Sequence, residues 1–157
     1  MTLTDIAVGA RLEHLCQFRI TFSDHQVQRT PLGLRVTFVI GGGRCEGPRL
    51  QGDFLPGGGD WVVIGDDGVA RLDVRATLRT DDGALIHLTS TGRAQLDDEA
   101  VARLWAGELI RADEMCARSS PLFETGSERH AWLNAAHTVA VNQFSLHEVH
   151  YDVSVVR

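Results

Sequence analysis

The sequence predicts an all-β protein: a single antiparallel β-barrel of about ten strands with one short α-helix. Three observations carry this prediction. Short runs alternate apolar and polar residues, glycine-rich turns separate the runs, and only one segment has helical spacing. No linker, repeat or low-complexity tract divides the chain, so we expect one domain over residues 1–157.

The alternating runs follow one another along the chain. In the first run, one face of the expected strand holds Leu12, His14, Cys16, Phe18, Ile20 and Phe22. In a later run, one face holds Leu34, Val36, Phe38 and Ile40. Turns of sequence DDG at 66–68 and 81–83 bound the central strands, and further strand-like runs are PLFET, HTVAVNQF and EVHYDVSVV. The exception is a helix expected over 98–109, with Asp97 or Asp98 as N-cap and an apolar stripe that includes Trp105. Trp105 fits core packing or a lid over the barrel mouth.

The two DDG turns predict how the central strands pair. If each closes as a three-residue loop with its glycine in the left-handed conformation, Leu78 faces Ile86 and Thr77 faces His87. A two-residue loop would mix polar and apolar faces, so we predict the three-residue form. The same reasoning at 66–68 pairs Ile64 with Ala70.

These registers gather polar side chains into one field on a three-stranded meander: Trp61, Arg71, Asp73, Arg75, His87 and Thr89. Such a field is either the wet outside of the sheet or the lining of a site. A tryptophan among polar residues, and an aspartate flanked by arginines two positions away on each side, favour a lining. The residues alone leave both interpretations open.

The segment GGGRCEGPRLQGDFLPGGGDW, the spacing from Asp73 to Ile86, and HAWLN at 130–134 resemble the domain-of-unknown-function 3237 family, also called uncharacterised protein family 0311. The resemblance covers most of the chain from about Leu12. It implies a compact antiparallel barrel of the lipocalin/allene-oxide-cyclase-like type that encloses a pocket. Matching motif positions that carry chemistry are Arg44, Asp60, Trp61, Asp73, Arg75, Trp132 and Asn134. Because Asp73 and Arg75 belong to the motif, the resemblance implies that they point into a cavity shared with Trp61, Asp60 and Trp132.

Composition narrows the classes of function. The net charge of −6 argues against a nucleic-acid or anionic-membrane binder. The chain has no lysine, which excludes Schiff-base chemistry. Three scattered cysteines and the lack of a signal-peptide pattern predict a reduced, cytoplasmic protein. No phosphate loop, zinc motif or hydrolase motif is present, so we expect no cofactor and no metal. We also expect a homodimer or a higher homo-oligomer.

Two functions remain. The first is a cofactor-independent lyase, isomerase or cyclase that acts by acid/base chemistry on a small aromatic or polyketide-like molecule in the cavity. The second is a small-molecule carrier barrel, which needs a cavity but no tuned acid. For the enzyme, the expected catalytic residues are Asp73, Arg75, Asp60 and His87, and the expected substrate-binding residues are Trp61, Trp132, Arg44, Thr89 and Asn134. A cavity carboxyl with a raised pKa would favour the enzyme.

Overall fold

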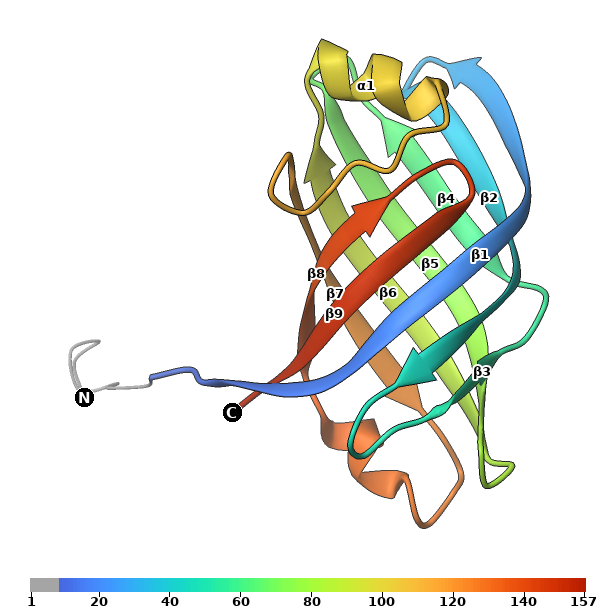
Figure 1. The fold of residues 1–157 in the computed structure, drawn as a ribbon, viewed down its shortest axis with the longest axis vertical. Coiled ribbons are helices and arrows are strands. Elements are labelled where there is room, and N and C mark those ends of the chain that lie inside the picture. The colour runs from blue at the N-terminus through green and yellow to red at the C-terminus, as the bar shows by residue number, and fades with distance from the viewer. Residues whose placement is uncertain (1–8) are drawn as a thin grey trace.

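The computed structural model describes residues 9–157, which form nine strands, one α-helix and a short 3-10 helix (Figure 1). In chain order the elements are β1 (Leu12–Thr30), β2 (Gly33–Glu46), β3 (Gly52–Phe54), β4 (Gly59–Ile64), β5 (Val69–Thr80), β6 (Leu85–Gln95), α1 (Asp98–Trp105), β7 (Cys116–Glu124), η2 (Ala131–Ala135), β8 (Thr138–Phe144) and β9 (Glu148–Val156).

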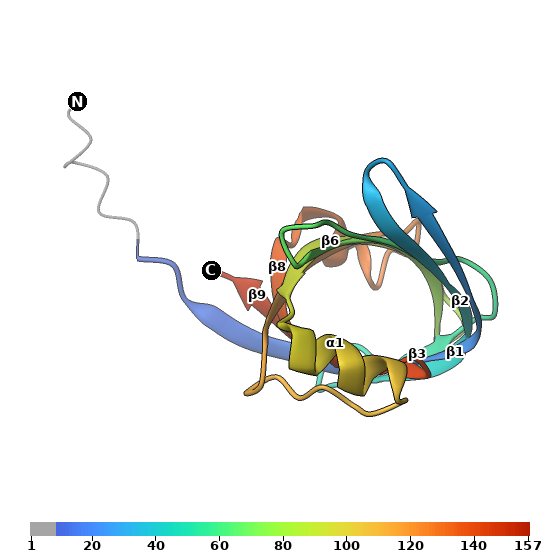
Figure 2. The same cartoon turned by 90° about the horizontal axis from the view of Figure 1, so that it is seen from above.

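The strands close into one antiparallel ring, as the sequence predicts (Figure 2). Each strand from β4 to β9 pairs with the next, β3 and β4 both bridge β2 and β5, and β1 pairs with both β2 and β9. Closure removes the open edges that a flat sheet of this size would present. The junction of β7 with β8 is the shortest, with two paired positions, Arg118 with Val141 and Ser119 with Ala140.

The registers predicted from the two DDG turns are confirmed. Leu78 pairs with Ile86 and Thr77 with His87, and Ile64 pairs with Ala70. Both turn glycines have positive φ, 74° at Gly68 and 88° at Gly83, as a three-residue loop with a bulge requires. The loop chemistry therefore sets which side chains share a face.

The barrel interior is filled by two packed clusters of side chains. One, at the end of the barrel far from α1, includes Phe18, Phe54 and Phe123, whose rings meet edge to face. The other lies beneath α1 and includes Phe38, Val62, Leu72 and Leu104. The predicted inward faces of β1 and β2 are confirmed for Cys16, Phe18, Ile20, Val36, Phe38 and Ile40, which are buried. The prediction is wrong for Leu12 and His14, which are exposed, because a β-bulge between His14 and Cys16 shifts the alternation and turns Leu15 inward.

Helix α1 lies across one end of the barrel (Figures 1 and 2). Asp97 is the N-cap, and its carboxylate accepts a hydrogen bond from the backbone N–H of Ala100 at 2.7 Å. The helix ends at Trp105, four residues before the predicted end at position 109. Gly107 adopts a φ of 85°, which breaks the helical path, and the chain then turns down the outside towards β7. Neither α1 nor any other helix in the described part of the chain has the length and apolar character to cross a membrane.

Candidate functional site

The polar field on the central strands faces solvent, so the prediction that it lines a cavity is wrong. The side chains of Asp73 and Arg75 are 46 % and 54 % exposed and lie 3.5 Å apart at their closest charged atoms. His87 is also exposed, Thr89 is half-buried, and Trp61 is 37 % exposed. These residues occupy the outer face of β4, β5 and β6.

Trp61 has a structural explanation on this outer face. The guanidinium carbon of Arg75 lies 5.8 Å from the centroid of its ring, so the two side chains cover one another. An exposed tryptophan packed beneath an arginine needs no cavity, which removes the main argument for a lining. The alternation of the strand was predicted correctly, and only the choice of inner face was wrong.

Asp60 alone among the predicted catalytic residues points into the barrel. It is 8 % exposed, and its direct cross-strand neighbours are Phe38 on β2 and Val74 on β5, both buried. One carboxylate oxygen accepts a hydrogen bond of 3.1 Å from the backbone N–H of Asp73. Within residues 9–157, no arginine or histidine forms an ion pair with Asp60.

Burial dominates the electrostatics of Asp60. Loss of hydration disfavours the charged form and raises its pKa from 3.8 to about 7, with a smaller contribution from the negative charge of Asp73. The hydrogen bond from the backbone N–H of Asp73 acts in the opposite direction. A carboxyl group with this pKa is present in both protonation states at neutral pH, which is what acid/base catalysis requires.

A cavity of about 30 Å³ lies beside Asp60, beneath α1. Its walls come from the apolar cluster that includes Phe38, Val62 and Leu72, and its cover includes Leu104 and Trp105 of α1. The lining is apolar apart from four side chains: Asp60, Asn142, Ser145 and Tyr151. Ser145 is already used at the β8–β9 turn, where its hydroxyl accepts hydrogen bonds from the backbone N–H groups of His147 and Glu148.

Three of the polar groups in and beside this cavity were missed by the sequence analysis. Tyr151 and Asn142 are paired positions on β9 and β8, and Ser119 on β7 donates a hydrogen bond of 2.9 Å to the side-chain oxygen of Asn142. All three are buried. Burial, and to a lesser extent the charge of Asp60, raises the pKa of Tyr151, so its phenol is neutral at physiological pH. A signal was available, since Asp60, Asn142 and Tyr151 each stand in phase with apolar residues two positions away.

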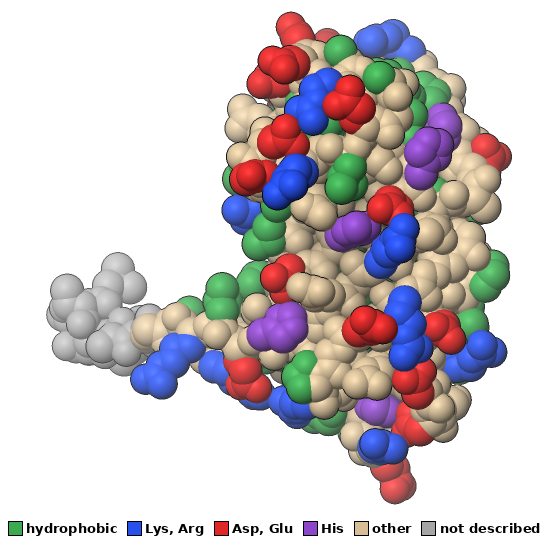
Figure 3. All heavy atoms as spheres, viewed as in Figure 1, with side chains coloured by type: hydrophobic (Ala, Val, Ile, Leu, Met, Phe, Trp, Pro, Cys, Tyr) green, Lys and Arg blue, Asp and Glu red, His purple; other side chains and the backbone are tan. Residues whose placement is uncertain are grey.

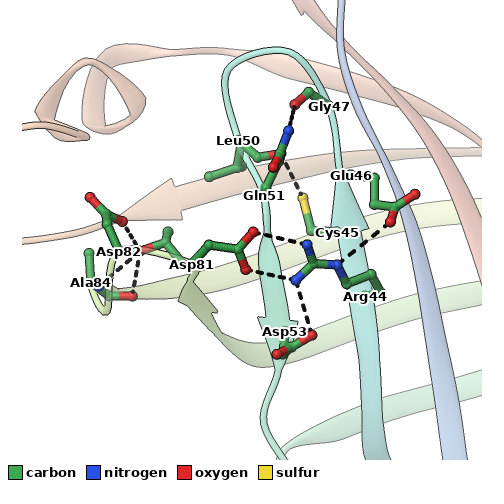
Figure 4. A network of polar contacts seen from close by, with 11 residues as sticks. Arg44, Cys45, Glu46, Gly47, Leu50, Gln51, Asp53, Asp81, Asp82 and Ala84 are labelled. Carbon is green, nitrogen blue, oxygen red and sulfur yellow. Dashed lines mark hydrogen bonds and ion pairs between the residues drawn. The ribbon is translucent and has the colours of Figure 1, made fainter.

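The remaining predicted binding residues lie on or beside β3 and η2, at the end of the barrel opposite α1 (Figure 1). Figure 4 shows Arg44 in a two-pronged ion pair with Asp81, at 2.8 and 2.9 Å, and in contact with Asp53 at 3.2 Å. These hydrogen bonds hold the pKa of Asp81 below its usual range and tie β2 to the β5–β6 turn. Arg44 therefore has a structural role, because it links β2 to β3 and to the β5–β6 turn.

Trp132 and Asn134, on η2, also have structural partners at this far end. The guanidinium carbon of Arg49 lies 3.8 Å from the centroid of the Trp132 ring. The Asn134 side chain exchanges two hydrogen bonds with the backbone of Thr125, at 2.8 and 2.9 Å. Neither residue lines the cavity beneath α1, so the structure does not bring the predicted catalytic and binding residues together.

Similarity to known proteins agrees with this architecture. A UPF0311 protein of Clostridium acetobutylicum is 32 % identical over 102 residues, which cover 65 % of this chain and 65 % of that protein. A β-barrel-like protein from Acinetobacter baumannii has a TM-score of 0.79 and 30 % identity, covering 96 % of this chain and 98 % of the other.

An enzyme from Penicillium herquei shares the fold with a TM-score of 0.68 and 21 % identity, covering 93 % of this chain and 96 % of the other. The solved structures with this fold thus include an enzyme. The profile of the family described as "Protein of unknown function (DUF3237)" matches residues 10–156. Over nearly its whole length, the chain belongs to the DUF3237 family, and the predicted resemblance is confirmed.

Proposed function

We propose that the protein is a cofactor-independent enzyme that acts by acid/base chemistry on a small apolar molecule in the cavity beneath α1. The single observation that carries this proposal is Asp60, a carboxyl group buried among apolar side chains without a paired cation in the described residues. Burying such a group costs free energy that a neutral side chain would not. Carboxyl groups whose pKa is shifted by burial in an enclosed cavity are typical of active sites.

The chemistry available to Asp60 is proton transfer. With a pKa of about 7, it can remove a proton as a carboxylate or donate one as an acid. Lyase, isomerase and cyclase reactions all depend on such steps. The surroundings fit an uncharged, largely apolar substrate, because no basic side chain lines the cavity in the described part of the chain.

Substrate entry requires movement at the α1 end of the barrel. A cavity of about 30 Å³ holds roughly two water molecules, whereas binding sites for organic molecules usually reach some 300 Å³ or more. The cover over the cavity includes one short helix, whereas most of the remaining lining belongs to hydrogen-bonded strands. Trp105 is already 38 % exposed, and α1 buries only Ala100 and Leu104. Outward displacement of α1 would enlarge the cavity without breaking a strand pair.

A carrier barrel is the second candidate function, favoured by the apolar character of most of the lining. It accounts less well for Asp60, because a carrier for apolar molecules gains nothing from a buried acid. The two functions differ in whether a bound molecule exchanges a proton with the protein.

Kemp elimination of 5-nitrobenzisoxazole tests the enzyme proposal, since this flat apolar probe needs only a base that removes a ring C–H proton. We expect a rate above the buffer reaction that rises with pH around 7, and loss of that rate in Asp60→Asn. Asp73→Asn is the matched control, because Asp73 lies outside the barrel on the neighbouring strand. It should keep the rate, with the pH dependence moved to lower pH because the negative charge of Asp73 raises the pKa of Asp60. A wild-type protein that does not accelerate the elimination, or an Asp60→Asn variant as active as the wild type, would overturn the proposal.

A further inference from the structure

The side-chain nitrogen of Asn142 is buried in the cavity wall without a hydrogen-bond partner among the described residues, and acid/base chemistry at Asp60 does not explain it. The residue is 1 % exposed, and its side-chain nitrogen Nδ2 has no hydrogen-bond partner among the described residues. An amide nitrogen offers two N–H donors, and a buried donor without an acceptor is rare in native proteins because it loses its hydration without compensation. Asn142 also lines the cavity.

The orientation of the Asn142 amide is held by its neighbour. Ser119 Oγ donates to Asn142 Oδ1 at 2.9 Å, which assigns the amide oxygen to the serine and leaves the nitrogen free. The strand pairing supports this contact, since Ser119 pairs with Ala140, two positions before Asn142 on the same face of β8. The free donor is therefore fixed in place.

Tyr151 stands directly opposite Asn142 in the β8–β9 pair, and both side chains are buried on the inner face. Directly opposed residues on one face have their Cβ atoms about 5 Å apart. The Tyr151 phenol stays protonated, so it can donate a hydrogen bond from the same wall, and it is near enough to Asp60 to sense its charge. One cavity thus collects an amide donor, a phenol donor and a proton-transferring carboxyl group.

We propose that Asn142 binds the carbonyl oxygen of the substrate, and that the substrate class is a neutral, enolisable carbonyl compound with an apolar frame. This inference rests on the proposed function and names its substrate. A carboxylate or phosphate ester would bring a second negative charge next to Asp60 without a cation in the described lining to balance it. A neutral carbonyl oxygen accepts from Asn142 Nδ2–H, and the apolar walls bury the rest of the molecule.

The reaction step follows from this arrangement. Asp60 in its carboxylate form takes a proton from the carbon next to the carbonyl group, and the C–H bonding electrons form a carbon–carbon double bond. The carbonyl π electrons move onto oxygen, giving an enolate that Asn142 and Tyr151 stabilise by hydrogen bonds. Asp60, now protonated, returns the proton to the same carbon or to another carbon of the conjugated system, which completes an exchange or an isomerisation.

Binding of matched probe pairs tests the role of Asn142 without relying on turnover. The pairs are 2-tetralone with tetralin and 2-indanone with indane, which differ only in the carbonyl group. We expect the wild type to bind the ketones about tenfold more tightly than the hydrocarbons. Asn142→Leu should lose this preference while retaining hydrocarbon binding, and Ser119→Ala should lose part of it because the amide is no longer held.

The control is Ser90→Ala, which removes a buried hydroxyl group that lies outside the cavity lining and has no hydrogen-bond partner in the described part of the chain. It should leave the ketone preference unchanged. A Raman spectrum of bound 2-tetralone adds a direct readout, because a hydrogen bond lowers the carbonyl stretching frequency. We expect the lower frequency in the wild type and its loss in Asn142→Leu.

Equal affinity for ketone and hydrocarbon in the wild type would overturn the inference, as would failure to bind either ketone or an unchanged preference in Asn142→Leu. The Kemp elimination keeps the two proposals distinguishable. If Asp60 proves inactive there while the ketone preference still depends on Asn142, the enzyme proposal fails and carbonyl recognition stands. If Asp60 is active but the preference is absent, only the carbonyl inference fails.

Discussion

The buried Asp60 carboxyl group should make the protein less stable as the pH rises. Its ordinary pKa of 3.8 applies in the unfolded chain, and burial raises it to about 7 in the folded protein. Between these two values the folded state holds a proton that the unfolded state has released. Stability therefore decreases with increasing pH across this window. The decrease begins near pH 4 and is complete once the pH exceeds the folded pKa.

The size of the effect follows from the difference between the two pKa values. The difference is about three pH units, and each unit corresponds to about 1.4 kcal/mol, so the contribution is about 4 kcal/mol. Asp60→Asn removes it. The asparagine oxygen can still accept the hydrogen bond from the backbone N–H of Asp73, so the main local contact survives.

Urea unfolding of the wild type and Asp60→Asn at pH 4, 5, 6, 7 and 8 measures this contribution. All other titrating groups are common to both proteins and cancel in the difference. We expect the free energy of unfolding of the variant, relative to that of the wild type, to increase by about 1.4 kcal/mol per pH unit from pH 4 to 7 and then to stay constant. A difference that stays constant from pH 4 to 8 would refute the reasoning, because Asp60 would then titrate alike in both states.

Two further predictions rest on the structure, and a third carries over the expectation from the sequence that the protein is a homodimer. Asp73→Asn and Arg75→Ala, on the outer face, should each change the free energy of unfolding by no more than about 0.5 kcal/mol in urea titrations, and a larger loss would mean that the pair is not exposed. Ser90→Ala removes a buried hydroxyl group that has no hydrogen-bond partner among residues 9–157, and it should stabilise the protein by about 1 kcal/mol. A lower melting temperature than that of the wild type would contradict this prediction. Light scattering should give the mass of a dimer, and a monomer at working concentration would contradict that expectation.

The sequence determined the β architecture and much of its register. Residues alternate with period two, and only a three-residue loop at each DDG turn keeps apolar side chains opposite apolar ones, so neighbouring strands align in a single way. Gly68 and Gly83 supply the left-handed conformation that such a loop needs. These are local effects, since they depend on residues within one hairpin. The N-cap at Asp97 was likewise readable, because a cap depends only on its own first turn.

The tertiary structure decided which face of the sheet became the interior. Alternation assigns residues to two faces but does not label them, and here Trp61 and the Asp73–Arg75 pair suggested the wrong one. Asp60 is in phase with Val62 and Ile64, so it had to point inward for Val62 to be buried and for Ile64 to pack against the core.

The meeting of Asp60 with Asn142 and Tyr151 depended on the closure of the whole ring. These side chains come from β4, β8 and β9, which are far apart in the sequence and share one cavity because the sheet curls back onto β1. The raised pKa of Asp60 arises from burial among side chains contributed by several strands. The spacing of residues in the sequence predicts how neighbouring strands pair. The desolvation that raises the pKa of Asp60 exists only once the barrel has closed.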